Sequence, residues 1–219
     1  MNTLKYISND VSLPTPESSI KEIKQTFKHL VFTHLPIIEN NQYIGSIAEK
    51  DLLLFENDEE QIKNYSHLLE FFFAEENMSW LELLKIYATN DTNILPIINN
   101  DKKYIGYYEL NNILHLFYNT PFLSENGAII IIEKEIKAYS FSEISQIVES
   151  NDCNLLGMFI SDVHNDKVRI TLKMGYCNIS SISETFGRYG YQLLTSFHDD
   201  EALENLKNRS EYLQKYLNM

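Results

Sequence analysis

Glycine is scarce in this sequence, and so are the loops that depend on it. The chain has seven glycines in 219 residues, about 3% against an average of about 7%, and none stands in the spacing of a Walker A or dinucleotide-binding loop. The hydrolase pattern Gly-x-Ser-x-Gly and the metalloprotease pattern His-Glu-x-x-His are also absent. The six histidines are isolated, so no nucleophile can be paired with a base. We therefore expect no catalytic residues and a non-enzymatic protein.

Cysteines and metal-ligand clusters are equally sparse. The two cysteines, Cys153 and Cys177, are far apart in the sequence, and no Cys-x-x-Cys pair or histidine cluster has metal-ligand spacing. The sequence therefore suggests neither a disulfide framework nor a metal site. We expect both cysteines to be small buried hydrophobic side chains.

No hydrophobic run is long enough to cross a bilayer. The longest aliphatic stretch is Ile129–Ile132, and the first ten residues contain no apolar core of the kind that a signal peptide has. The sequence favours a soluble cytoplasmic protein without a membrane partner.

Positive charge is also in short supply. Lys and Arg number 18 against 31 Asp and Glu, which gives a formal net charge of −13. A field of that sign repels nucleic-acid phosphates and anionic lipids, so we expect neither as a partner. Apolar side chains, in contrast, are plentiful at 44% of the chain, which indicates packed globular cores.

The first half of the chain contains an internal repeat. The sequence Leu-Pro-Ile-Ile occurs at Leu35–Ile38 and again at Leu95–Ile98. The sequence Tyr-Ile-Gly follows each copy, at Tyr43–Gly45 and Tyr104–Gly106. The offset between the copies is nearly constant, and the similarity extends upstream of both motifs, so a whole structural unit is repeated.

Each copy predicts a helix, a strand hairpin and a second helix. In the first copy, residues 18–30 have apolar side chains at helical spacing, 35–38 and 43–47 are short apolar strands around a four-residue polar turn, and 49–55 start another helix with acidic residues. The second copy predicts the same elements at residues 80–87, 94–98, 104–108 and 110–118. Two such units can pack with pseudo-two-fold symmetry.

This pattern resembles the tandem CBS-domain pair, which is often called a Bateman module. The resemblance covers about residues 1–120 and implies a first CBS domain at 1–65 and a second at 66–120. It also implies two clefts between the domains, which in many members hold AMP, ATP or S-adenosylmethionine. The ligand signature of the family follows the glycine and consists of Ser or Thr, two residues, and then Asp.

The match to that signature is imperfect in both copies. The first copy keeps the acidic residue as Asp51, which could accept ribose hydroxyl hydrogens, but has Ala48 at the hydroxyl position. The second copy has Glu109 and Asn112 at the two positions, so a phosphate there would meet a negative charge. As ordinary alternatives, Asp51 is a helix N-terminal carboxylate and the histidine before the first Leu-Pro is a packed strand-end residue. The resemblance implies ligand-binding residues at Thr33, His34, Asp51, Asn93 and Asn112.

The second half of the chain reads as a different domain. Pro and Gly interrupt the helical pattern at residues 119–127, which indicates a linker or a covered loop. The domain predicted at 127–199 has the order βαββαβ, the ferredoxin-like arrangement. Its strands are expected at 128–132, 155–163, 168–173 and 191–197, and its helices at 141–148 and 179–189. The whole chain is therefore expected to have an α+β fold.

A βαββαβ unit behind a CBS pair resembles the ACT-like regulatory domain, and the complete architecture is similar to acetoin-utilisation protein B-like proteins. ACT domains bind amino acids near a glycine-containing loop, often across a dimer interface, but the corresponding loop here, residues 133–140, has no glycine. Residues 200–217 predict a C-terminal amphipathic helix that either docks on its own domain or packs on a second subunit.

The favoured interpretation is a regulatory or sensor protein. A small ligand, with an adenosine nucleotide as one candidate, would bind the CBS pair and signal to a separate partner protein, with the chain acting as a homodimer. The alternative is a ligand-free homo-oligomeric scaffold whose CBS clefts have degenerated, which the residues Ala48, Glu109 and Asn112 favour. An enzyme is the third hypothesis.

Overall fold

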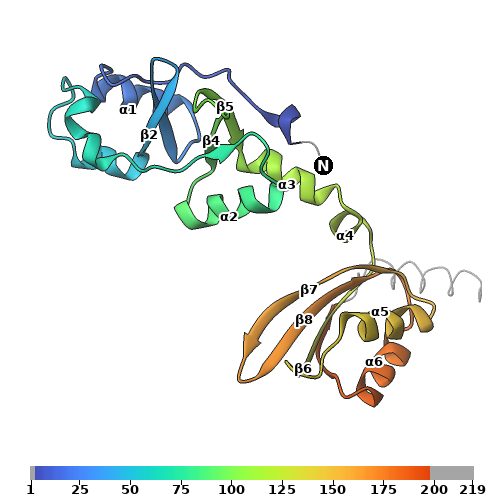
Figure 1. Ribbon diagram of the computed structural model, residues 1–219. Helices are drawn as coiled ribbons and strands as arrows, with labels where there is room; N and C mark the ends of the chain where they lie inside the picture. Colours follow the sequence, from blue (N-terminus) through green and yellow to red (C-terminus); the bar gives the residue numbers. More distant parts are fainter. Residues whose placement is uncertain (1–2, 198–219) are drawn as a thin grey trace, which may run out of the picture. The chain divides into compact units, whose positions relative to one another are not determined.

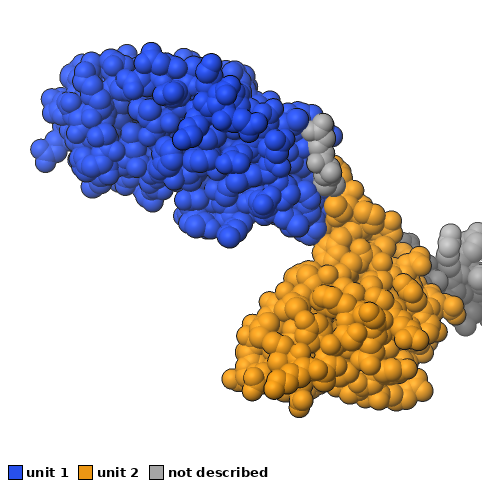
Figure 2. Space-filling view, viewed as in Figure 1, with its two compact units in different colours: residues 1–117 blue, residues 118–219 orange. Residues whose placement is uncertain are grey.

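The computed structural model describes residues 3–197, and the chain divides into two compact units at residues 1–117 and 118–219 (Figure 2). Each unit has its own hydrophobic core, so each is described by itself. The predicted C-terminal helix at 200–217 lies outside the described residues.

Unit 1 contains the repeat as two modules of similar structure (Figure 1). Module 1 is formed by α1 (Ile20–His29), β1 (His34–Glu39), β2 (Gln42–Ala48) and the 3-10 helix η2 (Glu49–Leu54). Module 2 is formed by α2 (Trp80–Asn90), β4 (Ile94–Ile98), β5 (Tyr104–Glu109) and α3 (Leu110–Tyr118). The 3-10 helices η1 (Leu4–Tyr6) and η3 (Ile62–Leu68) and the short strand β3 (Ala74–Glu75) complete the unit.

The first helix of each module starts with the same capping device. Ser19 caps α1, where its backbone N–H donates to the Glu22 carboxylate at 2.8 Å and its hydroxyl accepts from the Glu22 N–H. Ser79 and Glu82 repeat this capping box at the equivalent positions of α2, with the same 2.8 Å contact. A capping box satisfies two orphan donors of a helix N-terminus. The repeat therefore preserves a local signal that fixes where each helix begins.

The segment at residues 8–14, here called the first strap, hydrogen-bonds to both modules. Ser8 exchanges two backbone hydrogen bonds of 2.9 Å with Tyr107 of β5 in module 2. Further along, the carbonyl of Pro14 accepts the Ile38 N–H of β1 in module 1 at 3.0 Å. The first strap thus crosses from one module to the other.

The segment at residues 70–75, the second strap, makes the reciprocal crossing. Glu70 exchanges two backbone hydrogen bonds, 2.8 and 2.9 Å long, with Ser46 of β2 in module 1. The second strap then pairs as β3 in parallel with Ile97 and Ile98 of β4 in module 2. Because the two straps are related by nearly the same sequence offset as the modules, unit 1 has the pseudo-two-fold organisation that the repeat predicts.

The turn and helix predictions for module 1 need two corrections. The predicted four-residue turn is a two-residue turn, because Asn40 and Asn41 both adopt positive φ, 49° and 65°, as a type I′ hairpin requires. The helix predicted at 49–55 is a short 3-10 helix, η2, which ends at Leu54. The hairpin of module 2 is longer, and its extra residue is accommodated by Asn99, whose side chain accepts the N–H groups of Asp101 and Lys103.

Unit 2 has the predicted βαββαβ order. Its elements are α4 (Pro121–Ser124), β6 (Ala128–Glu135), α5 (Phe141–Ser150), β7 (Leu155–His164), β8 (Lys167–Met174), α6 (Ile179–Arg188) and β9 (Gln192–Phe197). The sheet order is β7-β8-β6-β9 with all neighbours antiparallel, and both long helices lie side by side on one face (Figure 1). The linker predicted at 119–127 contains the short helix α4, which begins at a proline in its first turn.

The prediction for the cysteines is wrong. Cys153, just before β7, and Cys177, just before α6, form a disulfide with their Cα atoms 5.4 Å apart. Cys153 is buried as expected and belongs to the core of unit 2. The bond joins the C-terminal side of α5 to the N-terminal side of α6, and Ser181 bonds to Asn151 across the same junction at 2.8 Å.

Reduction of this disulfide is expected to destabilise unit 2. The bond closes a loop with a sequence separation of 24 residues, for which the chain-entropy relation gives about 3 kcal/mol. Amide hydrogen exchange of β6 and β8, with and without reductant, measures this change. The double variant Cys153→Ala/Cys177→Ala is the control and should not respond to reductant. Reaction of both native thiols with a thiol reagent before any reduction would contradict the disulfide.

Candidate functional site

Four polar side chains meet where the second strap crosses module 1. They are His34, the first residue of β1, Lys50 and Asp51 of η2, and Glu70 of the second strap. We call this group the His34 cluster. Two of its members, His34 and Asp51, belong to the set expected from sequence.

His34 is buried, and one of its ring nitrogens lacks a hydrogen-bond partner. The residue is 2% exposed, and its ring packs edge-on against Phe72 at a centroid distance of 5.3 Å. Nδ1 lies 2.9 Å from the Thr33 hydroxyl. Nε2 lies 3.4 Å from a Glu70 carboxylate oxygen, but no hydrogen bond of good geometry satisfies it among the described residues. Burial lowers the pKa of His34 below 6.5, and the carboxylate of Glu70 only partly offsets this effect.

Glu70 joins His34 to Lys50. Its second carboxylate oxygen lies 3.2 Å from the Lys50 ammonium, and this contact raises the pKa of Lys50. The Lys50 side chain is 69% exposed and the Glu70 side chain 33% exposed, so the cluster opens to solvent on the Lys50 side. The Glu70 backbone is held by Ser46, so only the side chain of Glu70 is left to move.

Asp51 is half-buried at the same place. Its negative charge raises the pKa values of both His34 and Lys50. Ala48 is buried and supplies no hydroxyl, as the sequence indicates. The buried hydroxyl of Ser46 lies on β2, but it is already hydrogen-bonded to the Tyr43 hydroxyl at 2.9 Å.

Thr33 and Asn93, at equivalent positions of the two modules, bind each other. The Thr33 N–H donates to the Asn93 side-chain oxygen at 2.9 Å, and the Asn93 N–H donates to the Thr33 hydroxyl oxygen at 3.1 Å. The Asn93 amide also donates to the carbonyl of Val31 at 2.6 Å. These two predicted ligand residues therefore connect the modules, and Thr33 also contacts His34.

The remaining predicted residue, Asn112, is the third residue of α3. Its side chain is partly buried. On β5 of the same module, the side chains of Tyr104, Tyr107 and Tyr108 are buried. Tyr107 occupies the position of Ser46 and donates its hydroxyl to Asp10 at 2.7 Å. With no small hydroxyl next to it, the buried Tyr104 hydroxyl lacks a partner within the described part of the chain. The polar cluster thus belongs to module 1.

Two residues of the His34 cluster were not predicted from sequence. Only one feature of the sequence could have identified Lys50, namely its position next to Asp51 in the imperfect ligand signature. No such feature identifies Glu70, because the second strap carries no motif and its contact with module 1 is made through backbone pairing.

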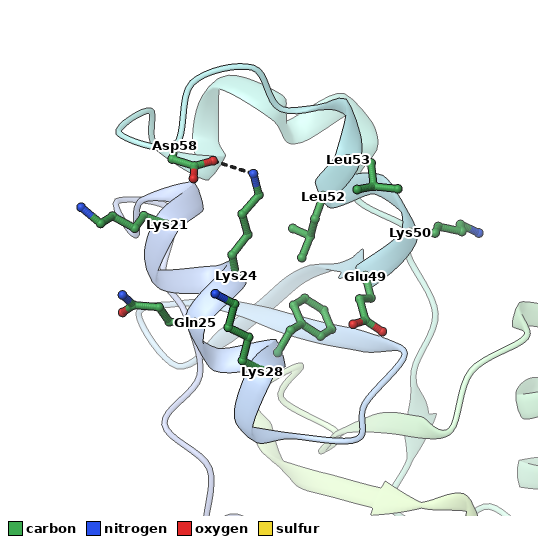
Figure 3. A pocket seen from close by; sticks show the side chains of 10 residues that line it. Lys21, Lys24, Gln25, Lys28, Glu49, Lys50, Leu52, Leu53 and Asp58 are labelled. Carbon is green, nitrogen blue, oxygen red and sulfur yellow. Dashed lines mark hydrogen bonds and ion pairs between the residues drawn. The ribbon is translucent and has the colours of Figure 1, made fainter.

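A cavity of about 760 Å³ lies elsewhere on module 1, between α1 and η2 (Figure 3). Its lining includes none of the five predicted ligand residues. Lys24 lies 2.5 Å from Asp58 there, and Lys50 of the His34 cluster also belongs to the lining, so the cavity adjoins the cluster at this one residue. Lys21 is likewise paired, with Glu59 at 3.1 Å, so acidic neighbours already compensate these two lysines.

The described residues offer no metal centre and no membrane-spanning helix. Within residues 3–197, no group of three or more His, Cys, Asp or Glu side chains is arranged to hold a metal ion. Over the same range, none of the helices has the length and apolar character needed to traverse a bilayer.

Comparison with known families identifies module 1. Residues 8–58, which include the first strap and the whole of module 1, match the family model of the CBS domain. The inosine-5'-monophosphate dehydrogenase of Methanocaldococcus jannaschii is 18% identical over 165 residues, which are 75% of this chain and 33% of that protein. The chain therefore spans about a third of the length of this curated relative.

Solved structures are similar to about half of the chain. A CBS domain pair/ACT domain protein from Thermotoga maritima has 15% identity and a TM-score of 0.48, with 53% of this chain and 96% of that chain covered. The CBS domain of a bacterial CNNM/CorC family Mg²⁺ transporter in complex with ATP has 15% identity and a TM-score of 0.43, with 52% and 84% covered. The family match over residues 8–58 and the internal repeat are consistent with a CBS-domain pair in unit 1, and unit 2 is an additional α+β domain.

The burial of His34 predicts a pH dependence of stability. The folded-state pKa lies below the value of 6.5 that the unfolded chain has, so the unfolded state binds more protons between the two values. The free energy of unfolding that depends on a neutral, buried His34 is fully present above pH 6.5. It is lost as the pH falls through the folded-state pKa.

Urea unfolding at a series of pH values between about 5 and 8, where histidine titrates, measures the effect. The fluorescence of the single tryptophan, Trp80 on α2, reports on unit 1. His34→Gln should flatten the dependence, whereas His67→Gln, at an exposed position of η3, should leave it unchanged. If the free energy of unfolding depends on pH in the same way in the wild type and in His34→Gln, His34 is not the cause of the pH dependence.

Proposed function

We propose that this chain is a non-enzymatic regulatory protein whose CBS pair binds a small adenosine-containing ligand at the His34 cluster. The observation that carries the proposal is the buried His34, which presents an unsatisfied nitrogen beside an exposed lysine and a carboxylate. Lys50 and His34 provide nitrogen donors for a phosphate, and Asp51 provides acceptors for ribose hydroxyls. AMP, ATP and S-adenosylmethionine are the candidate ligands.

Regulation would follow because the segments that carry the cluster also bond to module 2. Thr33, in contact with His34, also bonds to Asn93 of module 2, and the second strap that carries Glu70 pairs with β4 of module 2. A ligand that binds two arrangements of these segments with different affinity shifts the balance between them. A separate partner protein would read that shift.

The proposal extends to the rest of the chain. The βαββαβ order of unit 2 is the basis for assigning it as an ACT-like domain, which would bind an amino acid and pair with a second copy in a homodimer. The predicted domain ranges, the similarity to acetoin-utilisation protein B-like proteins and the cytoplasmic location also remain proposals.

The second candidate function is a ligand-free scaffold. The specific observation in its favour is that Thr33 and Asn93 satisfy each other's hydrogen bonds, so neither needs a ligand. Ala48 supplies no hydroxyl, and the buried Tyr107 of module 2 stands where module 1 has Ser46. In this case unit 1 would serve assembly only.

Ligand-induced stabilisation separates the two functions. A ligand at 100 times its dissociation constant adds about 2.7 kcal/mol to stability, which is a rise in melting temperature of about 10 °C for a domain of this size. We expect such a rise with AMP, ATP or S-adenosylmethionine in a thermal-shift experiment. Asp51→Ala should abolish it, because the ribose acceptor is lost.

Glu49→Ala is the matched control, since Glu49 is also in η2 but lines the cavity between α1 and η2, here called the outer cavity. Loss of the rise in this variant, with a normal rise in Asp51→Ala, would move the site to the outer cavity. No rise with any adenosine compound would favour the scaffold. A rise with an amino acid alone would point to unit 2.

A further inference from the structure

The carboxylate of Glu70 bridges the two nitrogens on which the proposed phosphate contact depends. One carboxylate oxygen lies 3.4 Å from His34 Nε2 and the other 3.2 Å from Lys50 Nζ. Phosphates and carboxylates are recognised by the same charged donors through paired oxygens. A phosphate that contacts His34 and Lys50 would therefore need the position that the Glu70 carboxylate now fills.

We propose that Glu70 is a built-in competitor for the anionic group of the ligand, so that binding of a phosphate requires the Glu70 side chain to leave the His34 cluster. This inference rests on the proposed function, because it assigns a specificity-determining residue to the same site. Its consequence is that the resting protein discriminates against phosphorylated ligands.

The Glu70 contact with His34 is replaceable because it is imperfect. Nε2 is buried but has no hydrogen bond of good geometry among the described residues, and leaving such a group unsatisfied costs free energy. When Nδ1 accepts the Thr33 hydroxyl hydrogen, Nε2 carries the ring proton and can donate to an anion. A phosphate oxygen placed closer than the present carboxylate would satisfy it.

The second strap allows the side chain to move without unfolding. The Glu70 backbone is fixed by two hydrogen bonds to Ser46, 2.8 and 2.9 Å long. Its side chain is 33% exposed, so it has a direct route to solvent. Displacement therefore needs a change of side-chain rotamers only.

The charges around the cluster favour displacement over shared occupancy. Lys50 is the cation of the cluster, whereas Asp51 and Glu70 are both negative and Asp91 also acts on Lys50. A phosphate added to the intact cluster would face two carboxylates at short range. Departure of Glu70 removes one of them and releases Lys50.

The test is the binding of three probes to the full-length wild type and to Glu70→Gln by isothermal titration calorimetry. The probes are AMP, adenosine and inorganic pyrophosphate. We expect Glu70→Gln to bind AMP and pyrophosphate at least about tenfold more tightly, the effect of one charge-assisted contact, and to bind adenosine as the wild type does. The double variant Lys50→Gln/Glu70→Gln should lose the gain.

Glu75→Gln is the matched control, because Glu75 is an exposed glutamate of the same strap. It should bind all three probes as the wild type does. An equal gain in this variant would mean a general charge effect and would overturn the role of Glu70.

The remaining outcomes separate this inference from the proposed function. If adenosine and AMP bind but Glu70→Gln gains nothing for AMP or pyrophosphate, the competitor role is wrong and the proposed function stands. If Glu70→Gln gains pyrophosphate binding but no adenosine compound binds, the competitor role stands and the adenosine ligand is wrong. If no probe binds either protein, both are wrong.

Discussion

The structure of unit 1 depends on the exchange of two straps between its modules. A two-stranded hairpin by itself is marginally stable in water, and each module has one such hairpin at its centre. The second strap adds paired backbone to both modules, through Ser46 on one side and β4 on the other. The first strap likewise forms backbone hydrogen bonds with Tyr107 in module 2 and with Ile38 in module 1. The modules are therefore two halves of one folding unit.

The same exchange creates the candidate site. Glu70 reaches His34 and Lys50 only because the second strap, which follows η3 in the sequence, returns to lie along β2. The repeat gives the two modules equivalent backbone positions, but the buried Tyr107 of module 2 stands where module 1 has Ser46. The two modules are thus similar in backbone and different in side-chain chemistry, which is why the proposed site is placed in module 1.

Local signals in the sequence were sufficient for most of the fold. The apolar spacing of α1 and α2 and the alternation in β8 each depend on neighbouring residues, and they predicted these elements closely. Features that depend on distant pairing were missed. The short strand β3, the contact of Glu70 with module 1 and the disulfide between Cys153 and Cys177 join segments whose sequences carry no mark of each other.

The most direct test of this account is a crystal structure of the protein with AMP bound. The account predicts the phosphate within hydrogen-bonding distance of His34 Nε2 and Lys50 Nζ, the Glu70 side chain turned away, and the backbone bonds between Glu70 and Ser46 intact. AMP in the cavity between α1 and η2, or a phosphate remote from both nitrogens with Glu70 still in its present position, would contradict it.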